Sequence, residues 1–219
     1  DKTVFFEDGF DNNTNNWEIS STKDFKKFLE DGNYFIKYKS YWTKIAVLRE
    51  IQIDNKKDFE YEINFKILKF KYRLFLEIKL EDPTKKIKSG YSFLNRGVSI
   101  FFECREKSIE KSEIKQYLED NAIKTDQLGS GIDFKINEYN KITIRRISER
   151  YYFFLNETFL TEIYNVDLDV NRIVFAASES LIGIDHIKIS YLIENVNTAF
   201  NTAKYENSLE AYELFIKHY

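Results

Sequence analysis

Four carboxylates are the first candidates for chemistry in this sequence, and they stand at alternating positions of two largely apolar segments. Glu60 and Glu62 alternate with apolar residues in FEYEINFKI, and Glu77 and Glu81 share one face of YRLFLEIKLE. Because successive side chains of a β-strand point to opposite faces, both pairs lie opposite an apolar face. A retaining glycosidase needs two carboxylates about 5 to 5.5 Å apart. Charges that face solvent are the other interpretation, and it is the one we expect for both pairs.

Aromatic side chains form a second group. The segment YKSYW brings Tyr38, Tyr41 and Trp42 together, and Trp17 follows an Asn-rich loop. An exposed aromatic ring offers an apolar face on which a sugar ring can stack. We therefore predict that Tyr41 and Trp42 bind a ligand, with Arg96 of FLNRG as a polar partner. Since the chain has 20 Phe, 15 Tyr and 2 Trp, the alternative is that most of these rings fill the core.

The loop EDGFDNN concentrates oxygen ligands near the start of the chain. It contains Glu7, Asp8, Asp11 and Asn12. Calcium binds about six to eight oxygen atoms from carboxylates and carbonyls. One expectation is therefore a structural Ca²⁺ that holds strand ends together. The other is that these residues form turns, in which Asp and Asn bond their own backbone.

Other chemistries lack the residues that they need. Cys104 is the single cysteine, so the chain cannot form an internal disulfide or a cysteine-cluster zinc site, and we expect a buried apolar residue there. His186 and His218 have no second histidine or cysteine at metal or triad spacing. No phosphate-binding glycine loop occurs among the 7 glycines. We predict no catalytic residue, and the sequence does not decide whether the chain is an enzyme.

Charge and hydropathy exclude two classes of partner. The chain has 33 basic and 36 acidic residues and a formal net charge of −3, whereas a nucleic-acid-binding domain usually carries a basic excess. Its apolar runs, such as residues 151–155, are too short for a transmembrane helix. We expect a glycan or a protein partner, no nucleic acid and no membrane insertion. A secreted, periplasmic or cell-surface location is favoured over a cytoplasmic one.

The elements that must position these residues are short strands separated by turn residues. The candidate strands are TVFFE, YFIKYKS, KIAVLREIQI, FEYEINFKI, YRLFLEIKLE, GVSIFFECRE, IDFKI, NKITIRRI, YYFFLN, RIVFAAS and IDHIKISYLI. Many short strands without long helices between them predict an all-β sandwich or barrel. KITIRRI and YYFFLN, joined by Ser148-Glu149-Arg150, predict a hairpin in which Arg145 and Arg146 point to opposite faces.

Two segments depart from the strand pattern. In residues 111–124, Ile114, Tyr117 and Leu118 recur at i, i+3 and i+4, which predicts a short amphipathic helix inserted between strands. From Val196 onward the same spacing predicts two helices. Their apolar positions are Ala199, Phe200 and Ala203 in the first, and Tyr212, Phe215, Ile216 and Tyr219 in the second.

The order of FFEDGFDNNTNNW, DGNYFIKYKS, FEYEINFKI, YNKITIRRISERYYFFLNETFL and IGIDHIKISY resembles bacterial jelly-roll domains of the concanavalin A-like lectin/glucanase superfamily, including laminin G-like modules. The resemblance covers residues 4–193 and implies a two-sheet antiparallel jelly-roll sandwich. It also implies that the last strand returns beside the first, which would add Asp185 to Asp8 and Asp11 as metal ligands. The tail resembles the start of a tetratricopeptide-type repeat, which cannot bury its apolar face alone.

These observations give a domain division and three functional hypotheses. Residues 1–195 are expected to form the sandwich and residues 196–219 a helical tail, in a fragment of a multidomain bacterial protein. The first hypothesis is a non-catalytic module that binds carbohydrate on the concave sheet face. The second is a protein-interaction or scaffold domain in which that face is filled. The third is a glycoside hydrolase, which needs a carboxylate pair that faces an open groove.

Overall fold

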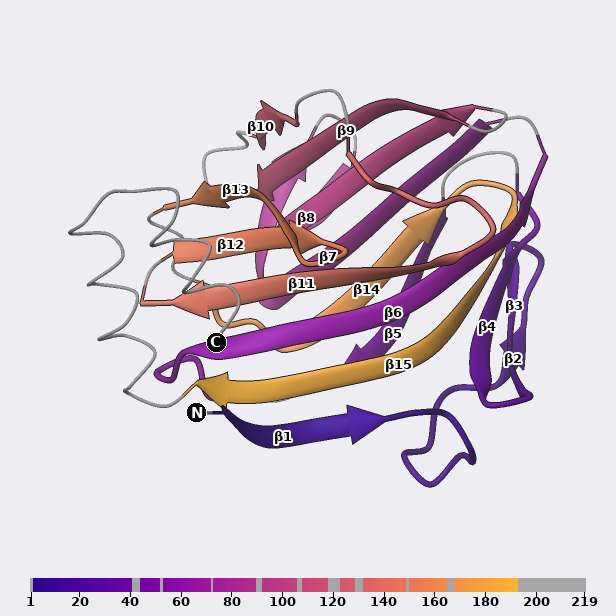
Figure 1. Ribbon diagram of the computed structural model, residues 1–219, viewed down its shortest axis with the longest axis horizontal. Coiled ribbons are helices and arrows are strands. Elements are labelled where there is room, and N and C mark those ends of the chain that lie inside the picture. The colour runs from indigo at the N-terminus through magenta and orange to yellow at the C-terminus, as the bar shows by residue number, and fades with distance from the viewer. Residues whose placement is uncertain are drawn as a thin grey trace.

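The computed structural model describes ten ranges of the chain, and every regular element in them is a β-strand (Figure 1). The ranges are 2–40, 44–51, 53–71, 73–89, 92–105, 108–117, 123–128, 132–148, 150–164 and 168–192. No helix in them is long and apolar enough to cross a membrane. The strands are β1 (Lys2–Asp8), β2 (Ser20–Ser21), β3 (Phe25–Glu30), β4 (Asn33–Tyr38), β5 (Lys44–Glu50), β6 (Phe59–Phe70), β7 (Arg73–Ser89), β8 (Ser92–Arg105), β9 (Ser108–Tyr117), β10 (Ile123–Gln127), β11 (Tyr139–Ile147), β12 (Arg150–Leu155), β13 (Thr158–Ile163), β14 (Arg172–Ala177) and β15 (Ser180–Leu192).

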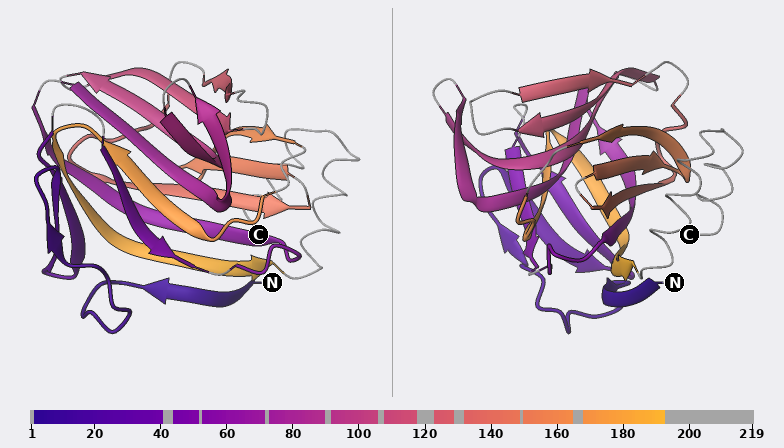
Figure 2. Two further views of the ribbon diagram at one scale, coloured as in Figure 1. Left: turned by 180° about the vertical axis from the view of Figure 1, so that it is seen from behind. Right: turned by 90° about the vertical axis from the view of Figure 1, so that its left-hand side faces the viewer.

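The strands form two antiparallel sheets packed face to face. The nine-stranded sheet has the order β13-β12-β11-β6-β15-β4-β3-β2, with β1 also paired to β15, and the six-stranded sheet has the order β10-β9-β8-β7-β14-β5. Figure 1 shows the nine-stranded sheet in front, and Figure 2 shows the two layers from behind and from the side. The last strand pairs with the first, from Lys2–Leu192 to Asp8–Ile187. The predicted two-sheet sandwich is confirmed.

Strand alternation fills the space between the sheets. In β6, Tyr61, Ile63, Phe65 and Ile67 are each 0% exposed, as their alternation with polar residues predicts. Cys104 lies on the inner face of β8 and is also 0% exposed, so the prediction of a buried apolar residue is confirmed. Burial raises the pKa of its thiol to about 12, with a smaller contribution from Glu110, so the thiolate is strongly disfavoured.

The predicted hairpin is present as β11 and β12. Its register runs from Ile142–Leu155 to Ile147–Arg150, and Ser148 in the turn has a φ of 56°. Arg145 points outward and binds Glu60, whereas Nη1 of Arg146 donates to the carbonyl of Lys57. The two arginines therefore serve opposite faces, as the strand period requires.

The helix predicted within residues 111–124 is wrong where the structure describes that segment. Ser108–Tyr117 is β9, which pairs with β8 and places Ile114 opposite Ile100. Ile114 is buried at 1% exposure because its strand alternates across the sheet. The helical spacing of apolar residues was also compatible with a strand, and the ladder to β8 decided the outcome.

IDFKI was predicted as a strand but is not paired in a sheet. The amide of Phe134 donates to the carbonyl of Ile132, and the Phe134 ring packs 4.5 Å from the ring of Phe102, measured between centroids. Ile132, Phe134 and Ile136 pack against the core, and their segment does not pair with a strand of either sheet. The sequence prediction also missed β2, β3, β10 and β13. The predicted tail helices lie outside the described residues.

Candidate functional site

Two of the three predicted ligand-binding residues lie outside the part of the chain that the structure describes. These are Tyr41 and Trp42. The third, Arg96, is opposite Asp82 in the ladder between β7 and β8, and its side chain is likewise outside the described part. The predicted aromatic site at YKSYW therefore stays a prediction.

Asp8 is the centre of a hydrogen-bonded loop at the end of β1. Its Oδ1 accepts from the amide of Phe10 at 2.7 Å, which forms the turn expected of an Asp in that loop. Its Oδ2 accepts from Asn15 Nδ2 at 2.7 Å and from the indole Nε1 of Trp17 at 2.5 Å. Asp8 is only 8% exposed. The carboxylate thus ties the Asn-rich loop to the first strand.

The indole bound by Asp8 belongs to an aromatic cluster under the loop. Trp17 is 3% exposed and lies 5.0 Å from Phe10 and 5.3 Å from Tyr34, measured between ring centroids. Tyr34 Oη donates to the carbonyl of Glu18 at 2.8 Å. Trp17 is therefore a core residue and not an exposed sugar platform, and Asp8 satisfies its single polar group.

The other two predicted calcium ligands are Asp185, from the strand that pairs with β1, and Asp11, from the first loop. Asp185 lies at an irregularity of β15, between the residues that pair with β4 and those that pair with β1. Asp11 is exposed, and its Oδ1 would be 3.6 Å from a Cβ built on Gly32. Among the described residues, no three His, Cys, Asp or Glu side chains are grouped so that they could hold a metal ion. The calcium site stays a prediction, and Asp8 has a hydrogen-bonding role that needs no ion.

Asp8→Ala is expected to lower the free energy of unfolding by about 1–3 kcal/mol, because the buried indole N–H of Trp17 loses its acceptor. Urea denaturation in the presence of a chelator measures this loss, with Asp11→Ala as the exposed control, expected within about 0.5 kcal/mol of wild type. An unchanged Asp8→Ala protein would contradict the hydrogen-bonding role. A calcium-dependent stabilisation that both variants abolish would instead establish the metal site.

The outer face of the six-stranded sheet carries an aromatic pair on its central strands. Phe75 of β7 and Phe101 of β8 stack with ring centroids 6.2 Å apart and an interplanar angle of 27°. Both are half-buried, while Leu76 and Phe102, the next residues along, are 0% exposed and face the core. The guanidinium of Arg73 lies 4.8 Å from the Phe75 centroid. The rings therefore sit on the outside of the sandwich, in a row of polar side chains.

Polar groups of β7, β8, β9 and β10 border this aromatic pair. Ser99 Oγ donates to Glu77 Oε1 at 2.6 Å, and Gln127 Nε2 donates to Glu113 Oε1 at 3.0 Å. The ladder places Glu77 directly opposite Phe101, and Phe101 opposite Glu113. Carboxylates, an amide and a hydroxyl thus line the edges of two apolar rings.

Two cations complete the face. Lys115 Nζ lies 3.7 Å from the Phe101 centroid, and Arg73 forms an ion pair with Glu103. The cations lie within cation–π distance of the rings and share the face with carboxylates. The face is therefore mixed in charge rather than strongly acidic or basic.

Next to this site, Lys79 and Glu81 form an ion pair of 3.0 Å in which each side chain is under 10% exposed. Burial lowers the pKa of Lys79, with Glu81 and Glu77 acting in the opposite direction. Gly97 leaves the space for the lysine, since a Cβ there would be 2.7 Å from Lys79 Cε and 2.4 Å from the Leu80 carbonyl oxygen. Gly97 is thus required for close packing.

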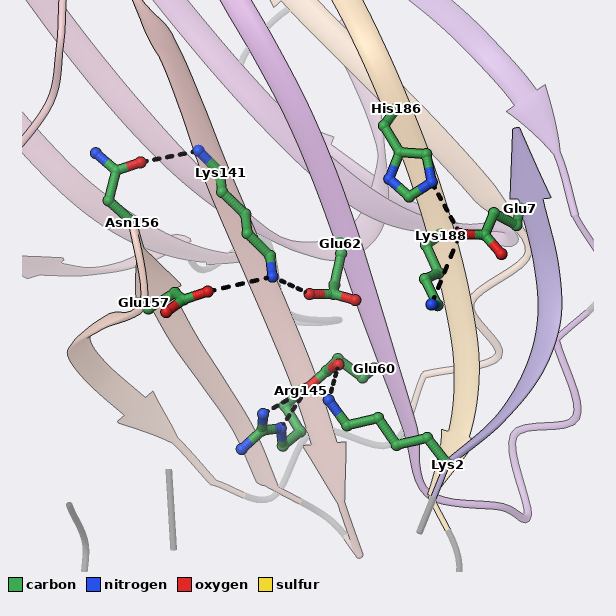
Figure 3. A network of polar contacts seen from close by, with 10 residues as sticks. All are labelled: Lys2, Glu7, Glu60, Glu62, Lys141, Arg145, Asn156, Glu157, His186 and Lys188. Atoms are coloured by element: carbon green, nitrogen blue, oxygen red, sulfur yellow. Dashed lines mark hydrogen bonds and ion pairs between the residues drawn. The ribbon is translucent and has the colours of Figure 1, made fainter. Parts of the chain in front are cut away.

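The outer face of the nine-stranded sheet carries a network of ion pairs (Figure 3). Glu60 is 1% exposed and binds Arg145 Nε at 2.7 Å through Oε2 and Lys2 Nζ at 2.5 Å through Oε1. Further along, Lys141 pairs with Glu62. The expectation that Glu60 faces solvent is wrong: it points away from the core, yet it is buried and paired.

The first and last strands are joined by a smaller group on the same face (Figure 3). Glu7 Oε1 lies 3.0 Å from His186 Nε2 and 3.6 Å from Lys188 Nζ. Both partners project from β15 toward β1 and are partly exposed. These polar contacts hold β15 beside β1.

Comparison with known proteins places the chain by its fold. No protein-family model and no curated protein matches the sequence. Among solved structures, the carbohydrate recognition domain of Emp47p has a TM-score of 0.59 at 9% identity, over 88% of this chain and 97% of that one. The Bacillus licheniformis β-glucanase has a TM-score of 0.54 at 12% identity, over 86% and 98%.

A third structure carries the description "Prominent members of the human gut microbiota express endo-acting O-glycanases to initiate mucin breakdown". It has a TM-score of 0.60 at 13% identity, over 87% of this chain and 100% of that one. At these identities the likeness shows the fold alone. The chain has the two-sheet antiparallel jelly-roll sandwich that a lectin domain and a glucanase share.

Proposed function

We propose that this chain is a non-catalytic carbohydrate-recognition module that binds a glycan on the outer face of the six-stranded sheet. The observation that carries the proposal is the Phe75–Phe101 pair, which lies outside the core and is bordered by hydrogen-bonding side chains. The sequence led us to expect binding on the concave sheet face, and the proposal places it on the outer face of this sheet. In this role the chain would work where glycans are accessible, which favours a secreted, periplasmic or cell-surface location.

The chemistry of the face suits a sugar. A pyranose has a face of C–H groups that packs on an aromatic ring, and a rim of hydroxyls that need both donors and acceptors. Glu77 is half-buried and supplies acceptors, and the exposed Gln127 amide supplies both a donor and an acceptor. Ser99 and Glu113 are 0% and 4% exposed and orient these two side chains from below. Because Lys115 lies over the Phe101 ring, a bound sugar would displace it or pack beside it.

The fold comparison supports this proposal without naming a ligand. One structural neighbour is described as a carbohydrate recognition domain, and the description of another names endo-acting O-glycanases, which are enzymes. Sandwiches of this kind host many functions, so the side chains of the face, and not the fold, support glycan binding.

Hydrolysis is the weaker alternative, because the carboxylates of β7 do not match either glycosidase geometry. Glu77 and Glu81 are four residues apart on one strand, which separates their Cα atoms by about 13 Å at the usual rise per residue. Retaining and inverting enzymes use carboxyl groups about 5 to 5.5 Å and 6.5 to 9.5 Å apart. Between the two glutamates lies Lys79, whose ammonium is paired with Glu81.

The test is a glycan-array screen followed by titration of the best glycan with surface variants. Phe101→Ala is expected to weaken binding by about tenfold or more, because an aromatic anchor at the centre of a site carries much of the affinity. Phe159→Ala is the matched control: Phe159 is 45% exposed on the nine-stranded sheet, and its loss should leave binding unchanged. Circular dichroism confirms that both variants are folded.

Two outcomes would overturn the proposal. One is a glycan that binds Phe101→Ala as tightly as wild type, which would place the site elsewhere. The other is release of shortened product from the glycan by wild-type protein, which would favour the hydrolase alternative.

A further inference from the structure

An aromatic row crosses the outer face of the nine-stranded sheet at the end where β3 and β4 meet the start of β15 and the end of β6 (right-hand side of Figure 1). The register sets Phe28 opposite Phe35, and Phe35 opposite Gly183. It continues from Gly183 to Lys66 of β6, and from Lys66 to Tyr139 of β11. Residues that lie directly opposite share a face. The residues next to them along the strands are 0% exposed in the core: Tyr34, Ile36, Ile182, Ile184, Phe65 and Ile67. The row therefore lies on the outside of the sandwich.

The side chains of this row form an apolar surface. The Phe28 and Phe35 rings are half-buried and stack with centroids 5.1 Å apart and an interplanar angle of 24°. Gly183 makes room for Phe35, since a Cβ there would be 2.9 Å from Phe35 Cε1 and 3.6 Å from Leu68 Cδ1. Leu68 is 38% exposed and Tyr139 is 48% exposed. Apolar groups are thus accessible along the row.

A second row, directly beside the first, is basic. Lys26 is opposite Lys37, Lys37 is opposite Leu181, and Leu181 is opposite Lys69. The three lysines of this row are exposed, and Lys66 of the aromatic row is half-buried beside them. We call Lys26, Lys37, Lys66 and Lys69 the lysine patch. Neither row contains a carboxylate, so this end of the face is positively charged.

The lysine patch differs from the other end of the same face in its lack of ion pairs. There, Lys2, Lys141 and Lys188 each pair with a carboxylate (Figure 3). In the part of the chain that the structure describes, no lysine of the patch forms an ion pair. Lys26 and Lys37 even face each other, and like charges directly opposite in a sheet destabilise it. The charge of the patch therefore does not stabilise the fold.

The size and chemistry of the two rows indicate an extended anion. Adjacent strands lie about 4.8 Å apart, so the aromatic row spans about 19 Å from β3 to β11, and the lysines span about 14 Å from β3 to β6. A single small anion is too short to reach all of these lysines. A polysaccharide with carboxylate or sulfate groups can place its charges at the ammonium groups and its C–H groups against the rings. We propose that the lysine patch binds such an acidic polysaccharide, separately from the glycan face of the six-stranded sheet.

Two other polyanions suit the surface less well. A single-stranded nucleic acid stacks its bases on free aromatic faces, whereas Phe28 and Phe35 cover each other. An acidic peptide would find no free backbone groups to pair with, because β4 and β15 use theirs in the ladders of the sheet. Both polymers therefore serve as comparisons in the test.

The test is binding of the full chain, at low salt, to immobilised dextran sulfate and to polygalacturonate, with unmodified dextran as the neutral control. The first polymer supplies sulfate groups and the second carboxylates, so the pair distinguishes the two kinds of anion. Lys37→Glu with Lys69→Glu is expected to weaken binding by about tenfold or more, because like charges then face each other across the interface.

A matched variant makes the same change in charge elsewhere. Lys56→Glu with Lys57→Glu alters two exposed lysines in the turn before β6, far from the patch, and should change the affinity by less than about twofold. Tyr139→Ala should weaken polysaccharide binding by about twofold to tenfold and leave binding of poly-L-glutamate unchanged, because the exposed ring contacts the sugar. Circular dichroism confirms that all variants are folded.

Three results would overturn the proposal. The first is that neither acidic polysaccharide binds more tightly than dextran. The second is that both double variants weaken binding equally, which would show an effect of net charge and not of the patch. The third is that poly-L-glutamate or a single-stranded oligonucleotide binds more tightly than either polysaccharide, which would identify a different class of partner.

Salt separates this proposal from the glycan face of the six-stranded sheet. At about 1 M salt the screening length falls to about 3 Å, which should abolish binding to the lysine patch and retain a neutral sugar packed on Phe75 and Phe101. A glycan whose binding survives that salt is the one to titrate against Phe101→Ala. At low salt, Phe101→Ala should bind the acidic polysaccharide as tightly as wild type does, so either proposal can fail without the other.

Discussion

Glu60→Ala is expected to lower the free energy of unfolding by about 3–5 kcal/mol, the cost of removing one partner of a buried ion pair. Glu60 is 1% exposed, and the Arg145 side chain that it binds is 6% exposed. The substitution removes the carboxylate that accepts from Arg145 Nε at 2.7 Å and from Lys2 Nζ at 2.5 Å. Two cations then remain at one site without that carboxylate.

Matched variants separate the ion pair from simple loss of packing. Lys2→Ala should cost under about 1 kcal/mol, because the Lys2 side chain is 33% exposed and solvent can replace its role. The double variant Glu60→Leu with Arg145→Leu should recover most of the loss, since apolar residues of similar size often replace a buried pair without cost. Chemical denaturation measures all three. A Glu60→Ala protein as stable as Lys2→Ala would show that the pair is not buried.

Trp17→Ala is expected to cost about 3–5 kcal/mol, the usual range for removing a large aromatic residue from a core. The indole is 3% exposed and packs against Phe10, Tyr34 and Phe6 at centroid distances of 5.0, 5.3 and 6.3 Å. The loss combines a cavity with an Asp8 carboxylate that no longer receives the indole N–H.

The control and the readout for this prediction use other residues of the chain. Phe159→Ala removes an aromatic ring that is 45% exposed and should change stability by about 0.5 kcal/mol or less. Far-UV circular dichroism follows unfolding in all variants and does not depend on tryptophan fluorescence. A loss of unfolding free energy of about 1 kcal/mol or less for Trp17→Ala would contradict the burial of Trp17 in the aromatic cluster under the first loop.

Strand patterns could be predicted from the sequence where alternation and turn chemistry agreed. β6 and the β11–β12 hairpin follow the predicted segments because each has a polar face and an apolar face. In β9 the alternation was interrupted by long polar side chains that also suit a helix. Gln116 illustrates this, because it is only 7% exposed beside Ile114. Pairing with β8, which begins at Arg105–Ser108, distinguishes a strand from a helix here, and the apolar periodicity of the segment alone does not show that pairing.

The candidate site could be predicted in part. The turn role weighed for Asp8 matches its bond to the Phe10 amide, and the sequence indicated the loop itself. The Phe75–Phe101 pair was missed, because the two rings are far apart in sequence and meet only through the register that sets Glu77 opposite Phe101. The sequence did contain a signal for it. In β7 and in β8, a phenylalanine stands at a position that the alternation of polar and apolar residues assigns to the outer face.

The burial of Glu60 could not be predicted for a related reason. Alternation correctly placed Glu60 outside the core, but it cannot say whether an outward side chain meets water. Burial of that carboxylate accompanies its bond to Arg145, which comes from a strand that lies far along the chain.

The most direct measurement of the proposed glycan site is NMR chemical-shift mapping of the isotope-labelled full chain with the best glycan from the array. We predict that the ring signals of Phe75 and Phe101 and the side-chain amide of Gln127 shift with one dissociation constant. The signals of Phe159 and Leu68, which are exposed on the other sheet, should stay in place. Shifts confined to the nine-stranded sheet or to the first loop would contradict the assignment of glycan binding to the six-stranded sheet.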